Sequence, residues 1–90
     1  MREMKIERAL VKHFGGLALK FISPGFDGVP DRLVLLPGGK IAFVELKAPG
    51  KKMHPLQVKR KSQLEALGLL VYCIDSFEQI GGILDEIRAT

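Results

Sequence analysis

Two apolar segments on either side of a glycine turn restrict the fold of this chain more than any other feature. They cover residues 33–36 and 41–44, and every side chain in both segments is apolar. Successive side chains of a strand point to opposite faces, so these segments would present apolar side chains on both faces of a sheet. Helices must then cover both faces. The pattern predicts an α/β fold, arranged as an α/β/α sandwich around a central mixed sheet.

The turn Pro37-Gly38-Gly39 decides which residues of the two segments face each other. A three-residue loop with a glycine in the left-handed region is a common hairpin connection. With this loop Leu36 pairs with Lys40, and the same register places Asp31 opposite Glu45. A two-residue glycine turn would shift the pairing by one residue and send Asp31 to the other face. We expect the three-residue loop.

Glu45 and Lys47 are two residues apart where the second segment ends, so a strand places both side chains on the same face. If Asp31 lies opposite Glu45, two carboxylates and an ammonium group come together. Paired carboxylates bind hard cations such as Mg²⁺, and an ammonium group can orient a nucleophile and offset developing charge. The pattern therefore indicates phosphodiester hydrolysis. The alternative is that Asp31 ends a turn while Glu45 and Lys47 form a solvated strand end.

Glu7 is a third acid, and its position is unusual. In a helix over the opening segment it falls within an apolar stripe. The stripe consists of Met4, Leu10, Val11 and Phe14, with Ile6 at its margin. A buried carboxylate is costly unless it is paired, protonated or coordinated, so Lys47 and a metal-bound water are its candidate partners. The alternative is a Glu7 side chain at the edge of the stripe that reaches water.

A helix predicted from Pro55 to Leu67 contributes Gln57. Proline suits the first turn of a helix, and Gly68 is a typical C-terminal stop. The expected apolar face consists of Leu56, Leu64 and Leu67. Gln57 lies at the flank of this face, where its amide could bind a water or a phosphate oxygen near a metal. A glutamine at such a flank can equally be an ordinary solvated residue.

The order and spacing of these residues resemble a known family. They are Glu7, Gly28-Val29-Pro30-Asp31, Val44-Glu45-Leu46-Lys47 and Gln57, on helix, strand, strand and helix. This arrangement resembles the virus-type replication-repair nuclease domain, VRR-NUC, of the PD-(D/E)xK nuclease superfamily. The resemblance covers nearly the whole chain and includes the predicted strand Leu69–Ile74.

The resemblance implies a nuclease that depends on Mg²⁺ or Mn²⁺. In it, Asp31, Glu45 and the backbone carbonyl of Leu46 would bind the metal, and Lys47 would assist catalysis. Glu7 and Gln57 would complete the site. One position departs from the pattern: the family often carries an aromatic residue three positions after the glutamine, and this chain has Arg60 there. The departure concerns the packing of the helix more than the chemistry.

Basic residues are concentrated after the second apolar segment. Between Leu46 and Leu64 the chain has six basic residues and no acid. They are Lys47, Lys51, Lys52, Lys59, Arg60 and Lys61. Beside a cleavage site such groups would contact phosphates, so we expect the last five to bind nucleic acid. The alternative is a solvated helix face.

Composition is consistent with one small domain over residues 1–90. The chain contains no apolar run of about eighteen residues and no charged-then-apolar leader, which predicts neither a membrane span nor a secretion signal. We expect a cytoplasmic protein of a bacterial or phage-infected cell. Cys73 is the single cysteine, so an intrachain disulfide is excluded and packing is its expected role.

The remaining elements follow from the same periodicities. The expected order is a helix (residues 2–14), a strand (17–22), a loop (23–28), the hairpin (31–47), a helix (55–67), a strand (69–74) and a final helix. Ser76 and Gln79 are spaced as a capping box for the final helix. The expected apolar face of that helix consists of Phe77, Ile80, Leu84 and Ile87.

These features together predict a metal-dependent endonuclease that acts on DNA and leaves a 5′-phosphate. The resemblance favours branched DNA such as a four-way junction. The main alternative is a nucleic-acid-binding module or regulatory subunit that has kept the fold without turnover. The intact Asp31, Glu45 and Lys47 argue against it, because a binder needs no carboxylate pair beside phosphate. A small protein-interaction domain would leave the position of Glu7 unexplained.

We also expect a homodimer. One small domain with one site makes a single nick, whereas two copies related by a two-fold axis present two sites to symmetric strands. Stand-alone members of the VRR-NUC family resemble junction resolvases in this respect. Ile83 and Met1 remain after core assignment and hint at an interface without locating it.

Overall fold

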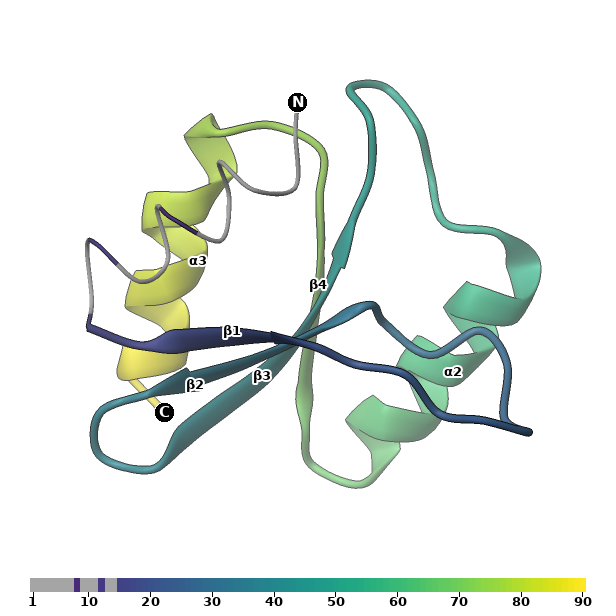
Figure 1. Cartoon of the computed structure of the whole chain (residues 1–90), viewed down its shortest axis with the longest axis horizontal. Helices are drawn as coiled ribbons and strands as arrows, with labels where there is room; N and C mark the ends of the chain where they lie inside the picture. The colour runs from purple at the N-terminus through teal and green to yellow at the C-terminus, as the bar shows by residue number, and fades with distance from the viewer. Residues whose placement is uncertain (1–7, 9–11, 13–14) are drawn as a thin grey trace.

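The computed structural model describes residues 8, 12 and 15–90 (Figure 1). Its elements are β1 (Leu17–Lys20), β2 (Arg32–Leu36), β3 (Lys40–Leu46), α2 (Pro55–Ala66), β4 (Leu70–Ile74) and α3 (Glu78–Arg88). Arg8 and Lys12 are helical and exposed. The rest of the predicted opening helix lies outside the described residues, and with it Glu7 and Met1.

The four strands form one mixed sheet in the order β1-β2-β3-β4. β1 pairs with β2 and β2 with β3 in antiparallel fashion, whereas β3 and β4 are parallel. A parallel pair needs a crossover connection, and α2 supplies it between β3 and β4. The predicted α/β fold with a mixed sheet is confirmed.

The hairpin of β2 and β3 has the register expected from its turn. Leu36 pairs with Lys40 and Arg32 with Val44, so the loop between the strands has three residues. Gly38 and Gly39 in this loop have φ of 85° and 74°, which other residues rarely adopt. Asp31 directly precedes β2 and therefore lies next to the end of β3.

One face of the sheet carries the hydrophobic core, beneath α3. The core cluster consists of Val34, Leu36, Ala42, Val44, Leu46 and Ile74 from the sheet and Ile80, Leu84 and Ile87 from α3. Ile83 packs against this cluster, so it is not an apolar residue left over for an interface. The prediction that Phe77 belongs to the apolar face is wrong: it is the N-cap residue and is 42% exposed, because α3 packs through its regular 80-84-87 stripe.

The capping interaction of α3 is present on its glutamine side. Oε1 of Gln79 accepts the backbone N–H groups of Asp75 and Ser76, at 2.8 and 3.2 Å. Both donors lie before the helix, in the turn between β4 and α3. The predicted capping box is therefore only half formed: Gln79 accepts from Ser76, but the N-cap residue is Phe77, whose side chain has no group to cap α3 in return.

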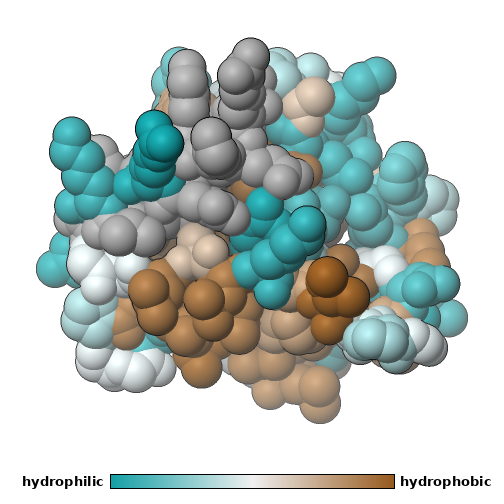
Figure 2. Space-filling model, viewed as in Figure 1, coloured by the Kyte–Doolittle hydropathy of each residue, from teal (hydrophilic) through white to brown (hydrophobic). Residues whose placement is uncertain are grey.

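The other face of the sheet is only partly covered. α2 lies on the side of β4, and none of its twelve residues is fully buried. Leu67, predicted to join its apolar face, is 77% exposed because the helix ends at Ala66 and Leu67 is the C-cap residue. Over β1, β2 and β3 the apolar side chains on this face gather at the surface, as Figure 2 shows.

We call this surface the open face; it consists of Leu17, Leu19, Leu33, Leu35, Ile41 and Phe43. Leu17, Leu19 and Ile41 are 54%, 45% and 45% exposed. The expectation that helices cover both faces is thus met on the core face, which α3 covers. On the other face, α2 covers only the part beside β4. In the part of the chain that the structure describes, no helix is long and apolar enough to cross a membrane.

Candidate active site

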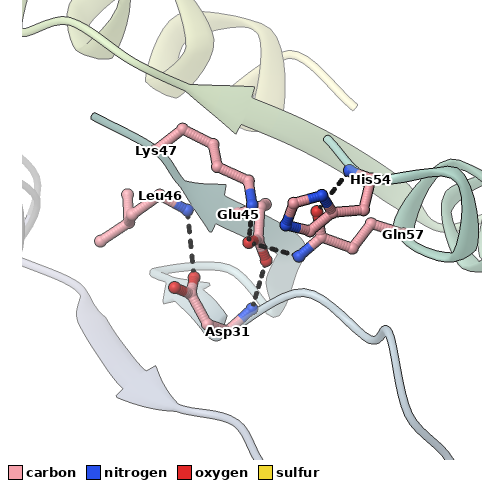
Figure 3. A network of polar contacts seen from close by, with 6 residues as sticks. All are labelled: Asp31, Glu45, Leu46, Lys47, His54 and Gln57. Carbon is pink, nitrogen blue, oxygen red and sulfur yellow. Dashed lines mark hydrogen bonds and ion pairs between the residues drawn. The ribbon is translucent and has the colours of Figure 1, made fainter. Parts of the chain in front are cut away.

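Asp31 and Glu45 meet where the hairpin strands end (Figure 3). The backbone N–H of Asp31 donates to Oε1 of Glu45 over 3.2 Å. In return, Oδ1 of Asp31 accepts the backbone N–H of Leu46 over 3.1 Å. Each carboxylate therefore accepts a backbone N–H from the segment that carries the other carboxylate. The two segments meet because the three-residue turn sets the register of the hairpin.

Lys47 lies on the same side as Glu45. Its Nζ is 3.3 Å from Oε2 of Glu45, and the two side chains are 14% and 7% exposed. The backbone N–H of Lys47 donates to the carbonyl of Ile74 over 2.9 Å, which extends the pairing with β4 beyond β3 itself. The ammonium group is thus held in a largely water-excluded place, where its charge acts more strongly than it would in water.

Gln57 connects α2 to this pair of strands. Its Nε2 donates to Oε2 of Glu45 over 2.9 Å, while its Oε1 accepts the backbone N–H of His54 over 2.8 Å. A backbone N–H can only donate, so the amide oxygen must face His54 and the amide nitrogen must face Glu45. The start of α2 therefore sets which way the amide of Gln57 points.

Glu45 is 5% exposed and has a donor on each oxygen. Oε1 accepts from Asp31, and Oε2 receives both Gln57 and Lys47. Hydrogen bonds and a counter-charge offset the desolvation cost of a buried carboxylate. This position is consequently built for a charged group.

Cys73 lies beside Glu45 in the parallel register of β3 and β4. Burial raises the pKa of the Cys73 thiol, and the carboxylate of Glu45 raises it further. The thiol is therefore protonated at neutral pH, in keeping with a packing role.

Arg32 is a site neighbour that the sequence did not single out. It is 4% exposed on the core face, and its Nη1 donates to the backbone carbonyl of Asp31 over 2.9 Å. The same carbonyl accepts the N–H of Phe21 over 2.9 Å. A charged residue at the start of an otherwise apolar strand is the signal that could have identified it.

The oxygen atoms at this strand end fit a hard cation. Among residues 8, 12 and 15–90, no group of three or more His, Cys, Asp or Glu side chains is arranged to hold a metal ion. Asp31 and Glu45 supply two carboxylates, and the backbone carbonyl of Leu46 is a further oxygen on the same strand that could serve as a ligand. Mg²⁺ is typically bound through one or two carboxylates, with waters and substrate phosphates as its other ligands, so this oxygen set fits Mg²⁺ or Mn²⁺.

The predicted nucleic-acid contacts fall into two segments near the site. Lys51 and Lys52 are exposed in the loop between β3 and α2. The backbone N–H of Gly50 in this loop donates to Asp75 over 3.4 Å. Lys59 is exposed on α2, where it remains available to a phosphate.

Two other basic residues of α2 have partners within the chain. Nζ of Lys61 is 2.8 Å from Glu65, in a partly exposed ion pair one turn along the helix. Nε of Arg60 donates to the carbonyl of Asp27 over 2.7 Å, and its Cζ lies 3.7 Å from the centre of the Phe26 ring. Arg60 is thus turned toward the loop before β2.

Comparison with known proteins agrees with this geometry. No protein-family profile matches the chain. A solved structure described as a VRR_NUC domain superimposes with a TM-score of 0.80 at 32% sequence identity, covering 91% of this chain and 89% of that one. A protein of Acyrthosiphon pisum secondary endosymbiont phage 1, named "Putative nuclease p44", is 50% identical over 91 residues, which span 98% of this chain and 97% of the relative.

The fold, the site and these similarities define a nuclease-type α/β domain. The chain belongs to the VRR-NUC family.

Proposed function

We propose that this protein is a Mg²⁺- or Mn²⁺-dependent endonuclease that hydrolyses phosphodiester bonds in DNA. The observation that carries the proposal is the constellation of Asp31, Glu45 and Lys47. One hairpin brings the two acidic residues into contact and places an ammonium group 3.3 Å from one of their carboxylates. Its occurrence in a nuclease family supports hydrolysis over a purely structural role.

Each residue has a distinct part in the proposed reaction. Asp31, Glu45 and the Leu46 carbonyl would hold the cation, which when bound polarises a phosphate oxygen and makes water more acidic. Lys47 orients the attacking water and offsets negative charge that develops on the phosphate. Gln57 holds Glu45 in position through its amide.

The proposed products are a 5′-phosphate and a 3′-hydroxyl. The water oxygen attacks phosphorus in line with the 3′-oxygen, the bond between phosphorus and that oxygen breaks, and the 3′-oxygen leaves with a proton. We propose branched DNA, such as a four-way junction, as the substrate. The exposed Lys51, Lys52 and Lys59 support binding through phosphates, which does not depend on base sequence.

We further propose that the working form is a homodimer in the cytoplasm of a bacterial or phage-infected cell. The open face supports a dimer, because exposed apolar patches on a small domain commonly mark interaction surfaces. Glu45 and the open-face residue Phe43 belong to β3 and point to the same side of the sheet. Two copies related by a two-fold axis would then offer two sites to one branched DNA.

The test is a panel of end-labelled DNAs: linear duplex, single strand, flap and four-way junction. Each is incubated with the protein in Mg²⁺, in Mn²⁺ and in EDTA, and product ends are typed by their sensitivity to phosphatase. We expect cation-dependent nicks that leave 5′-phosphate, with the junction cut fastest. Binding of the junction without cleavage under every condition would instead support a catalytically silent binding module.

A further inference from the structure

We infer that Arg60 is a positioning residue, which fixes the segment before Asp31 against α2, and is not a phosphate contact. The inference rests on the proposed function, because it takes Asp31 as a metal ligand. It concerns the loop between β1 and β2, for which the proposed chemistry assigns no role. That loop contains Phe26, Asp27 and Gly28 and leads directly to Asp31.

Arg60 contacts this loop in two ways. Its Nε donates to the backbone carbonyl of Asp27 over 2.7 Å. Its guanidinium also lies over the Phe26 ring, 3.7 Å from the ring centre. A planar cation on an aromatic face is a favourable geometry, and arginine is suited to stacking and hydrogen bonding at once. Nη1 further donates to Gln63 over 2.9 Å, which holds the side chain along α2.

Gly28 brings the loop into close approach with the same helix. It has φ of +87°, and a Cβ at this position would lie 2.7 Å from Cγ of Leu56 and 3.3 Å from Cγ of Arg60. A side chain there would therefore collide with α2. The loop backbone at Gly28 therefore packs against side chains of α2, just before the chain reaches Pro30 and Asp31.

Both carboxylates of the site are thus supported from α2. Gln57 donates to Glu45, and Arg60, three residues further along the helix, holds the loop that leads to Asp31. Residues three apart lie on one face of a helix, so the two supports act from the same side. The distance between Asp31 and Glu45 therefore depends on α2, which contacts Glu45 directly and the loop before Asp31.

These contacts leave Arg60 little freedom to follow a phosphate. Its Nε bond to Asp27 and its stacking on Phe26 hold the guanidinium against the loop, so only its remaining Nη–H groups could reach DNA without breaking a contact. Lys59, the preceding residue, is exposed and provides a cation without such a cost. The charge of Arg60 is therefore less important for function than the shape of its guanidinium.

Variants can separate shape from charge. Arg60→Lys keeps the charge but loses the plane and the Nε donor, and Arg60→Ala loses both. Phe26→Ala removes the stacking partner, while Phe26→Tyr keeps a ring and serves as its matched control. Lys59→Ala removes an equal charge from the next position and leaves the loop contacts intact.

The closing experiment measures three quantities on each folded variant. Hydrogen exchange in metal-free buffer reports the opening of residues 24–31, with exchange in β3 and α3 as an internal reference for global stability. Mn²⁺ affinity is measured by calorimetry. DNA affinity is measured against salt concentration in EDTA, where cleavage cannot occur.

We expect Arg60→Lys, Arg60→Ala and Phe26→Ala to speed loop exchange and to weaken Mn²⁺ binding by about 3- to 10-fold. This loss is smaller than the roughly 10- to 100-fold usual for residues that hydrogen-bond to a metal-binding side chain, because Arg60 acts on Asp31 only through the loop. Arg60→Lys should leave the salt dependence of DNA affinity unchanged. Phe26→Tyr should match wild type in Mn²⁺ affinity and in loop exchange. Lys59→Ala should lower only the DNA affinity and the slope of its salt dependence.

The inference is overturned if Arg60→Lys matches wild type in loop exchange and Mn²⁺ affinity, or if Arg60→Ala behaves like Lys59→Ala. Failure of the proposed function looks different. If wild type itself does not bind Mn²⁺, the metal site is wrong, and loop exchange alone then decides whether Arg60 fixes the loop.

Discussion

The backbone N–H of Asp31 lies 3.2 Å from Oε1 of Glu45, although 14 positions separate the two residues in sequence. Leu46, the residue after Glu45, donates its own N–H to the carboxylate of Asp31. These reciprocal bonds couple the two proposed metal ligands, so a change at one strand end shifts the other.

Lys47→Met should separate cation binding from catalysis. It removes the ammonium group that neutralises Glu45, so Mn²⁺ should bind about threefold more tightly or better, because a competing positive charge has gone. Cleavage should nevertheless fall roughly 100-fold or more, the usual scale for loss of a group that stabilises charge developing in the transition state. Calorimetry and single-turnover cleavage measure the two effects. If Mn²⁺ affinity falls together with the rate, Lys47 assembles the site and has no separate catalytic role.

Gln57→Ala should weaken Mn²⁺ binding by about tenfold, the low end for a residue that orients a ligand. It should also cost about 1 kcal/mol of unfolding free energy, because the backbone N–H of His54 loses its acceptor at the start of α2. Ser62→Ala, at an exposed position on the same helix, is the control. Mn²⁺ affinity equal to wild type in Gln57→Ala would show that Glu45 keeps its orientation without the amide.

Neutralising Lys51 and Lys52 together should weaken binding to DNA of any sequence. The slope of log affinity against log salt should become shallower by roughly 0.9 for each phosphate of the duplex that the variant no longer neutralises. A double change at Lys40 and Arg88 removes the same charge at the turn end of the hairpin, opposite the site end, because Lys40 pairs with Leu36 and donates to the carbonyl of Thr90, two residues after Arg88. Equal slopes for the two double variants would assign the loop lysines to a solvated surface.

Ile41→Lys should dissociate the proposed dimer, because it places a charge within the open face. Light scattering at micromolar concentration should give twice the 9.9 kDa chain mass for wild type and the chain mass for the variant. Leu67→Lys changes an apolar residue that is 77% exposed outside the open face and should remain dimeric. A wild-type mass near the monomer, with or without junction DNA, would contradict the dimer.

The sequence predicted the parts of the site that depend on local geometry. A three-residue turn fixes the hairpin register, and the register alone brings Asp31 to Glu45. Strand periodicity places Lys47, and the proline at the start of α2 places Gln57. These relationships need only spacing and known turn conformations.

The parts that were missed depend on contacts between distant segments. Arg60 was expected to bind nucleic acid, and nothing local indicates that the loop around Phe26 folds back under it. The apolar pattern of β2 and β3 predicts two buried faces but not which element covers each. For that reason the exposure of Ile41 could not be foreseen.

The most direct test of the proposed site is the cleavage rate of Glu45→Ala and Asp31→Ala on a labelled four-way junction in Mg²⁺, beside wild type. Loss of a cation ligand removes several kcal/mol of transition-state stabilisation, which corresponds to roughly 100-fold or more in rate. We predict that both variants lose cleavage and still bind the junction in metal-free buffer, slightly more tightly than wild type because a negative charge near phosphate is gone. Cleavage by Glu45→Ala at the wild-type rate would contradict the proposed site.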